Sequence, residues 1–141
     1  SRVVLETGFK DKAEKTVEIK TDRKWNDGLS LFFFARMFLD SKRYVSVPTI
    51  IEFDTVKTTI NFISKKENIS IDVLDYDVKT VYLKGDANWT GVYGLTGKFE
   101  GWFTDDDAHI PISAKMKVYV GNVDIELVKW KRGDWTPPQA K

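Results

Sequence analysis

Residues 26–40 read NDGLSLFFFARMFLD and form a short segment with the spacing of an α-helix. Four apolar side chains and one arginine recur at i, i+3, i+4, i+7 and i+8, which is one helical face: Leu29, Phe32, Phe33, Arg36 and Met37. Most of the remaining faces are also apolar: Leu31, Phe34, Phe38 and Leu39. Asn26 or Asp27 is placed to cap the first turn. A helix that is apolar nearly all round must be buried on most sides. We therefore expect a short buried helix, Asp27 to Asp40, lodged against or inside a curved sheet, with a fully buried strand as the alternative.

The rest of the chain shows the alternation and composition of β-strands. Val17 and Ile19, for example, alternate with Glu18 and Lys20. Strand character extends over nine segments: 3–5, 16–20, 44–53, 56–64, 69–73, 78–83, 95–104, 110–120 and 123–131. The order predicts a mainly β fold, a curved antiparallel sheet or half-barrel of about nine strands around the helix. The chain has 141 residues and no internal repeat, so residues 1–141 are expected to form a single β domain.

Turn residues and prolines predict how these strands connect. Gly121-Asn122 is a two-residue hairpin signal, because both residues tolerate positive φ. The polar link Lys65–Asn68 suits a second hairpin loop. Pro48 cannot donate to a ladder, so residues 44–53 form an edge strand or break at this proline. The tail from Gly133 is expected to be frayed.

Composition excludes several classes of function. The 22 basic and 21 acidic residues are interspersed and give a net charge of +1, which is unlike the clustered positive charge of nucleic-acid-binding proteins. No cysteine is present, so disulfides and thiolate chemistry are excluded. The longest apolar run, Leu31–Ala35, is too short to span a bilayer. These residues contain no signal peptide, so the chain either never had one or is a mature or trimmed form.

The sequence shows no catalytic centre and implies no cofactor. His109 is the only histidine, and no Gly-x-Ser-x-Gly motif supports a catalytic triad. Paired carboxylates could act in acid–base chemistry, but they sit among strands and turns, where they usually form the solvated face of a sheet. A metal site would draw on Asp105, Asp107 and His109, whose spacing fits no established loop. The alternative is a solvated turn, and we expect the chain not to be an enzyme.

The ligand-binding candidates are aromatic residues and one arginine: Phe34, Arg36, Phe38, Trp89, Tyr93 and Trp102. Trp89 and Tyr93 lie in a glycine-rich loop, and loops that display large aromatic side chains favour binding. These rings are also typical of a packed core. Arg36 could hold a carboxylate or phosphate as a bidentate fork, or it could emerge at the sheet rim.

Several phrases together resemble a known family: Trp25–Ser30 running into Phe33–Arg36, then Gly94–Asp106, Ile110–Ile112, Gly121–Val123 and Glu126-Leu127. In order and spacing they are similar to bacterial exported proteins of domain-of-unknown-function family 3108. The resemblance covers residues 25–130. It implies an envelope location, no established activity, and a long antiparallel sheet curling around a helix, as in lipoprotein-carrier half-barrels. Because family members carry more sheet before the helix, it also implies that this chain is the C-terminal portion of a longer half-barrel.

These observations lead to three functional hypotheses. The first is a non-enzymatic periplasmic or otherwise exported protein that binds an apolar small molecule, lipid or lipoprotein in the concave face of its sheet. The second is an interaction or scaffold module that contacts another envelope protein. The third, and least favoured, is a hydrolase or metal-dependent enzyme at the turn from Asp105 to His109.

Overall fold

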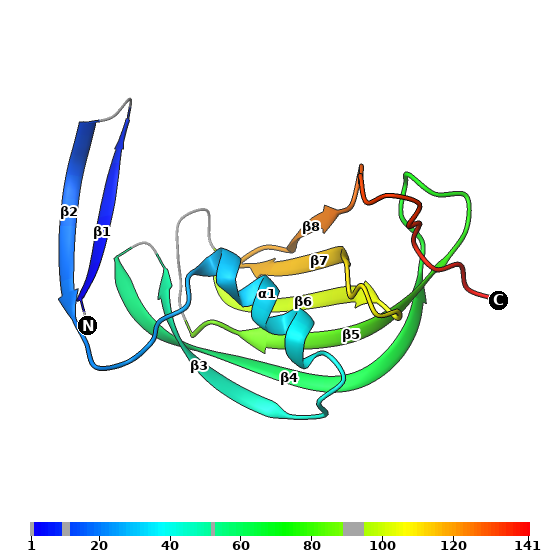
Figure 1. Ribbon diagram of the computed structural model, residues 1–141, viewed down its shortest axis with the longest axis horizontal. Helices are drawn as coiled ribbons and strands as arrows, with labels where there is room; N and C mark the ends of the chain where they lie inside the picture. Colours follow the sequence, from blue (N-terminus) through cyan, green and yellow to red (C-terminus); the bar gives the residue numbers. More distant parts are fainter. Residues whose placement is uncertain (1, 10–11, 52, 89–94) are drawn as a thin grey trace.

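The computed structural model describes residues 2–9, 12–51, 53–88 and 95–141. Its elements follow in the order β1 (Arg2–Phe9), β2 (Lys12–Lys20), α1 (Gly28–Phe38), β3 (Tyr44–Ile51), β4 (Asp54–Ile69), β5 (Val78–Asp86), β6 (Leu95–Thr104), β7 (Pro111–Val118) and β8 (Asn122–Glu126). β1 and β2 form an antiparallel hairpin of their own, which stands beside the main sheet (Figure 1).

The main sheet is an antiparallel meander of six strands in the order β3-β4-β5-β6-β7-β8. Every strand pairs with its neighbour in sequence, and β3 and β8 remain as the two edges, so the sheet is open and not closed into a barrel. The predicted mainly β, antiparallel fold is confirmed. The expected count of about nine strands is not, because the described residues form eight strands and two of these lie outside the main sheet.

The predicted hairpin loop at Lys65–Asn68 is wrong. β4 continues through these residues as one strand of 16 residues, and its pairing with β5 shifts register between Asn61 and Lys65. Ser64 has φ of 53° inside this irregularity, as expected where a β-bulge inserts extra residues into a strand. Polar residues beyond the bulge take outward positions, such as Lys65 opposite Tyr82. A bulge in a long strand therefore produced the polar pattern that resembled a loop.

The edge position of Pro48 is confirmed, and so is a hairpin between β7 and β8. Its turn lies at residues 119–121, however, because Asn122 already begins β8 opposite Lys117. β7 and β8 pair across the turn, where Gly121 has φ of 89°. β3 runs unbroken through Pro48 at the sheet edge. Asn26 covers this edge, because its amide donates to the Pro48 carbonyl at 3.0 Å and its carbonyl accepts from Ile50 N at 2.7 Å.

The predicted helix is confirmed at Gly28–Phe38, and the strand alternative is excluded. Asp27 is the N-cap, with its carboxylate accepting from the Ser30 amide at 2.6 Å. This bond lowers the pKa of Asp27, assisted by a second bond from the Ser30 hydroxyl. The cap fixes where the helix begins, and hence which residues face the sheet.

One side of α1 packs on the sheet and forms the larger core. The buried residues of this core come from the helix and its C-terminal end, and from β4, β5 and β6 of the sheet: Ala35, Leu39, Ile60, Phe62, Val81, Leu83 and Phe103. Burying side chains of this size contributes about 1.5–3 kcal/mol each. The expectation of a helix buried on most sides is wrong, however, because only Ala35 within the helix is buried. Six strands leave the sheet open, and Figure 1 shows α1 on one face with its other side uncovered.

The C-terminal tail is docked, so the prediction of a frayed end is also wrong. Pro137 is fully buried, and Gln139 forms a bridge with Val78 at the start of β5. Lys79 N donates to Pro138 O at 2.9 Å, and the Tyr76 hydroxyl donates to Pro137 O at 3.0 Å. The tail lies at the end of the sheet that contains the second, smaller core, which consists of Ile71, Val78 and Ile112.

Candidate functional site

The predicted ligand-binding residues do not converge on one site. Phe34 and Phe38 pack against the larger core, with ring centroids 4.6 Å apart and each 6.5 Å from Phe62. Trp102 points to the opposite face, because its neighbour Phe103 lies in the core below α1 and successive strand residues alternate faces. Trp89 and Tyr93 lie outside the described residues.

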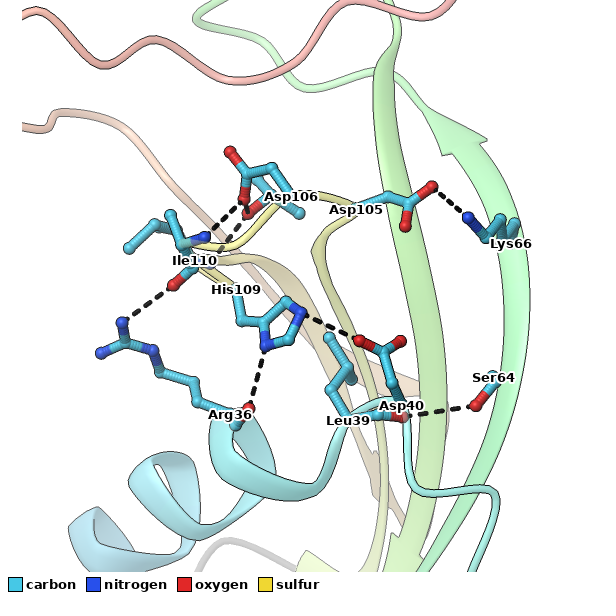
Figure 2. Close-up of polar contacts among 11 residues, drawn as sticks. Arg36, Leu39, Asp40, Ser64, Lys66, Asp105, Asp106, His109 and Ile110 are labelled. Carbon is cyan, nitrogen blue, oxygen red and sulfur yellow. Dashed lines mark hydrogen bonds and ion pairs between the residues drawn. The ribbon is translucent and has the colours of Figure 1, made fainter.

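Arg36 and His109 join the last turn of α1 to the turn between β6 and β7. The Arg36 guanidinium donates to the Ala108 carbonyl at 2.8 Å. His109 Nδ1 lies 3.0 Å from the Arg36 carbonyl, and its Nε2 lies 3.3 Å from Asp40 Oδ2 (Figure 2). Ser64 reaches the Leu39 carbonyl on the other side of the same helix end. One guanidinium nitrogen of Arg36 is thus bonded to backbone at the sheet rim, whereas its buried Nε has no hydrogen-bond partner among the described residues.

Asp106 is the centre of the same turn. Its Oδ1 accepts from the Thr104 hydroxyl at 2.6 Å and from the Ala108 amide at 3.1 Å, and its Oδ2 accepts from Trp135 Nε1 at 2.7 Å. Partial burial alone would raise the pKa of Asp106. The hydrogen bonds from Thr104, Trp135 and the backbone outweigh burial and lower that pKa. Asp106 thus ties the C-terminal tail to the β6–β7 turn.

The metal candidates lie in this turn as parts of protein contacts. Asp105 pairs with Lys66 at 2.8 Å, His109 contacts Asp40, and Asp107 is exposed. In the described part of the chain, no three His, Cys, Asp or Glu side chains gather in a way that could hold a metal ion. Figure 2 shows Asp105 turned toward β4 while His109 turns toward α1, so the two side chains diverge.

Trp102 belongs to a polar and aromatic group on the face away from α1. Its ring lies 5.3 Å from that of Tyr82, and its Nε1 donates to Glu67 at 2.6 Å. Lys65, 2.6 Å from Glu67, and Trp102 together lower the pKa of Glu67. Burial, followed by the bond to Glu100, raises the pKa of Tyr82. Every polar group here has a partner, so the cluster reads as a cross-strand brace.

The uncovered side of α1 carries four large apolar side chains, which we call the helix stripe: Leu29, Phe32, Phe33 and Met37. Their exposed fractions are 74%, 46%, 64% and 76% in that order. Leu29, Phe33 and Met37 are four residues apart and therefore line one helical face. Single exposed apolar side chains are ordinary, but a contiguous group usually marks an interaction site.

The sheet also carries exposed apolar side chains on its helix side. Val123 and Ile125 on β8 are 45% and 48% exposed. Val123 pairs with Met116, which in turn pairs with Phe99 of the core below α1, so these side chains share the helix side of the sheet. β8 is also the open edge of the sheet.

The exposure of the helix stripe was missed at the level of sequence, although a signal was present. A helix that is apolar all round needs cover on both sides, and a meander with short connections supplies a sheet on only one. In the described residues, no helix is long and apolar enough to cross a membrane.

Comparisons with protein-family models, with curated proteins and with solved structures give no match to this chain. The resemblance to domain-of-unknown-function family 3108 stays a prediction.

Proposed function

We propose that this chain is a non-enzymatic interaction module that docks a partner protein on the helix stripe. The observation that carries the proposal is the exposure of four large apolar side chains on one capped, well-anchored helix. Complete burial of a fully exposed side chain of this size contributes about 1.5–3 kcal/mol, and a partner would recover the share that corresponds to the area still exposed here. Aromatic and methionine side chains are also enriched in the centres of protein interfaces.

The packing below α1 favours this module over a carrier of an apolar small molecule or lipid. The space between helix and sheet is filled by core side chains, and Leu39, Ile60 and Phe62 are each only 1% exposed. A ligand in the concave face would have to displace the helix. The outward side of the helix requires no such rearrangement.

The partner we favour is a protein segment that presents apolar side chains in an extended conformation. β8 offers an open edge, and its Val123 and Ile125 face the same side of the sheet as α1. An added strand would take main-chain hydrogen bonds from β8 and pack alternate side chains toward the helix. The edge would give affinity, and the helix stripe would give specificity.

Site-specific photo-crosslinking in native cells tests this proposal. A crosslinker at Leu29 or Phe33 is expected to capture the same discrete protein. The substitution Met37→Ser is expected to weaken that capture about tenfold or more, because the methionine is the most exposed side chain of the helix stripe. The matched control is a crosslinker at Val120, which is 92% exposed and lies outside the stripe.

The outcomes separate the candidate functions. Docking on the helix stripe is contradicted if the crosslinker at Val120 gives the identical adduct. It is also contradicted if the crosslinkers at Leu29 and Phe33 capture no protein. Capture of lipid alone at Leu29 would favour the apolar-ligand carrier instead. Met37→Ser should leave thermal stability unchanged, since this side chain is 76% exposed.

We also propose that the module works in the cell envelope, which rests on the family resemblance alone. Osmotic-shock fractionation of native cells, followed by immunodetection, is expected to place the protein with a periplasmic marker. Recovery of the protein with a cytosolic marker would refute the envelope location. It would not contradict docking on the helix stripe.

A further inference from the structure

A groove of about 690 Å³ crosses the main sheet between the start of β3 and the β7–β8 hairpin. Its charged lining includes four lysines, and exposed tyrosines stand at its rim: Lys84, Lys98, Lys115, Lys117, Tyr44 and Tyr119. Lys84 follows buried Leu83 and pairs with Asn61, so it lies on the face turned away from α1. This site is therefore distinct from the helix stripe, and it is independent of the proposed function.

The lysines of the groove are available to a ligand. Within the residues that the structure describes, Lys84, Lys98 and Lys117 make no ion pair, and Lys115 has one exposed pair with Asp124 at 3.7 Å. The pairing of β6 with β7 places Glu100 opposite Lys115. Asp86 and Glu100 supply two acceptors among four cations, so the lining keeps an excess of positive charge.

We propose that the groove binds an acidic carbohydrate chain whose sugars carry carboxylates. Lysine ammonium groups are strong donors to carboxylates, and the faces of Tyr44 and Tyr119 offer flat apolar surface to the C–H side of a sugar ring. One oxygen of Glu100 accepts from the Tyr82 hydroxyl and one oxygen of Asp86 accepts from Asn88 N; their other oxygens and the Asn61 amide oxygen can accept from sugar hydroxyls. An inorganic polyphosphate chain has no hydroxyl donors for these acceptors and would meet only repulsion from the two carboxylates, which favours a sugar acid over polyphosphate.

Binding of a defined polygalacturonate oligomer to the full chain, measured by calorimetry, tests the proposal. We expect binding that weakens as salt rises and is lost with the fully methyl-esterified oligomer. The double variant Lys84→Ala/Lys117→Ala is expected to lose about tenfold in affinity. The matched control Lys129→Ala/Lys131→Ala changes the net charge equally outside the groove, and it should stay within about twofold.

Asp86→Ala separates a built carbohydrate site from simple attraction of a polyanion. Asp86 lines the groove, and its removal makes the protein more positive while deleting an acceptor. A sugar site predicts weaker binding, because a charged acceptor for hydroxyls is lost, whereas simple attraction predicts tighter binding. The proposal is overturned if polygalacturonate does not bind, or if the two lysine double variants lose the same amount of affinity. It is also overturned if Asp86→Ala binds polygalacturonate more tightly, or if oligo-dT of equal charge binds the protein better than polygalacturonate does.

Discussion

The substitution Gly85→Ala is expected to lower the free energy of unfolding by about 1–3 kcal/mol or more. A methyl group at this position would lie 2.6 Å from the Thr59 carbonyl oxygen and still closer to the Phe99 ring. Gly85 pairs with Ile60 on β4 and with Phe99 on β6, so it sits between two central strands of the sheet. The ring can turn aside, but the backbone oxygen belongs to a paired strand and can move only by distorting the sheet.

Urea denaturation of Gly85→Ala beside Gly28→Ala measures this effect. Gly28 is the matched control, because a methyl group there meets no atom within 4 Å and the position is the first residue of α1. Alanine is the better helix former, so Gly28→Ala should be neutral or more stable. Equal stability of the two variants would show that β4, β5 and β6 do not approach at Gly85 as closely as described.

Asp106→Ala is expected to cost about 2–4 kcal/mol, because it removes three hydrogen bonds to a carboxylate in one step. The Trp135 indole and the Thr104 hydroxyl would lose their acceptor, and Thr104 is fully buried. The docked tail should loosen first, since Trp135 is one of its anchors. Denaturation followed by tryptophan fluorescence would report both the global loss and the change around this ring.

The effect of Asp106 should depend on pH. Its pKa is lowered in the folded state, so its stabilising contribution is complete above the unfolded value, about 3.9, and is lost as pH falls through the folded value. The stability difference between wild type and Asp106→Ala should therefore narrow below about pH 4. Asp107→Ala is the neighbouring control, exposed and expected to stay within about 0.5 kcal/mol at every pH. A constant difference across the acid range would contradict the role given to the carboxylate.

Local signals in the sequence were sufficient to predict the helix and its cap. Asp27 precedes a clear 3.6-residue period, and the predicted helix appears within two residues of its expected ends. The hairpin between β7 and β8 followed from turn chemistry, although its turn lies one residue or more before the predicted pair, at residues 119–121. These features depend on neighbours within one turn of chain, which is why a single sequence reveals them.

Features that depend on distant partners were not predictable. Lys65–Asn68 has the composition of a loop, but pairing with β5 holds it in a strand. The tail has the composition of a frayed end, but Asp106 and the β5 backbone anchor it. Within the candidate site, one of the two interpretations of Arg36 from the sequence placed it at the sheet rim. The exposure of the helix stripe was missed, because it depends on how far the sheet curls around α1.

The place of α1 ahead of its sheet has a consequence for synthesis on the ribosome. Leu39 is buried against partners that include Phe103, which is made 64 residues later. At about 5–20 residues per second, the inner side of the helix waits roughly 3–13 seconds for its cover. During this interval both sides of α1 are exposed, so the nascent segment is a natural client for a holding chaperone. After folding, the sheet covers only the inner side of α1, and the helix stripe on its outer side stays exposed.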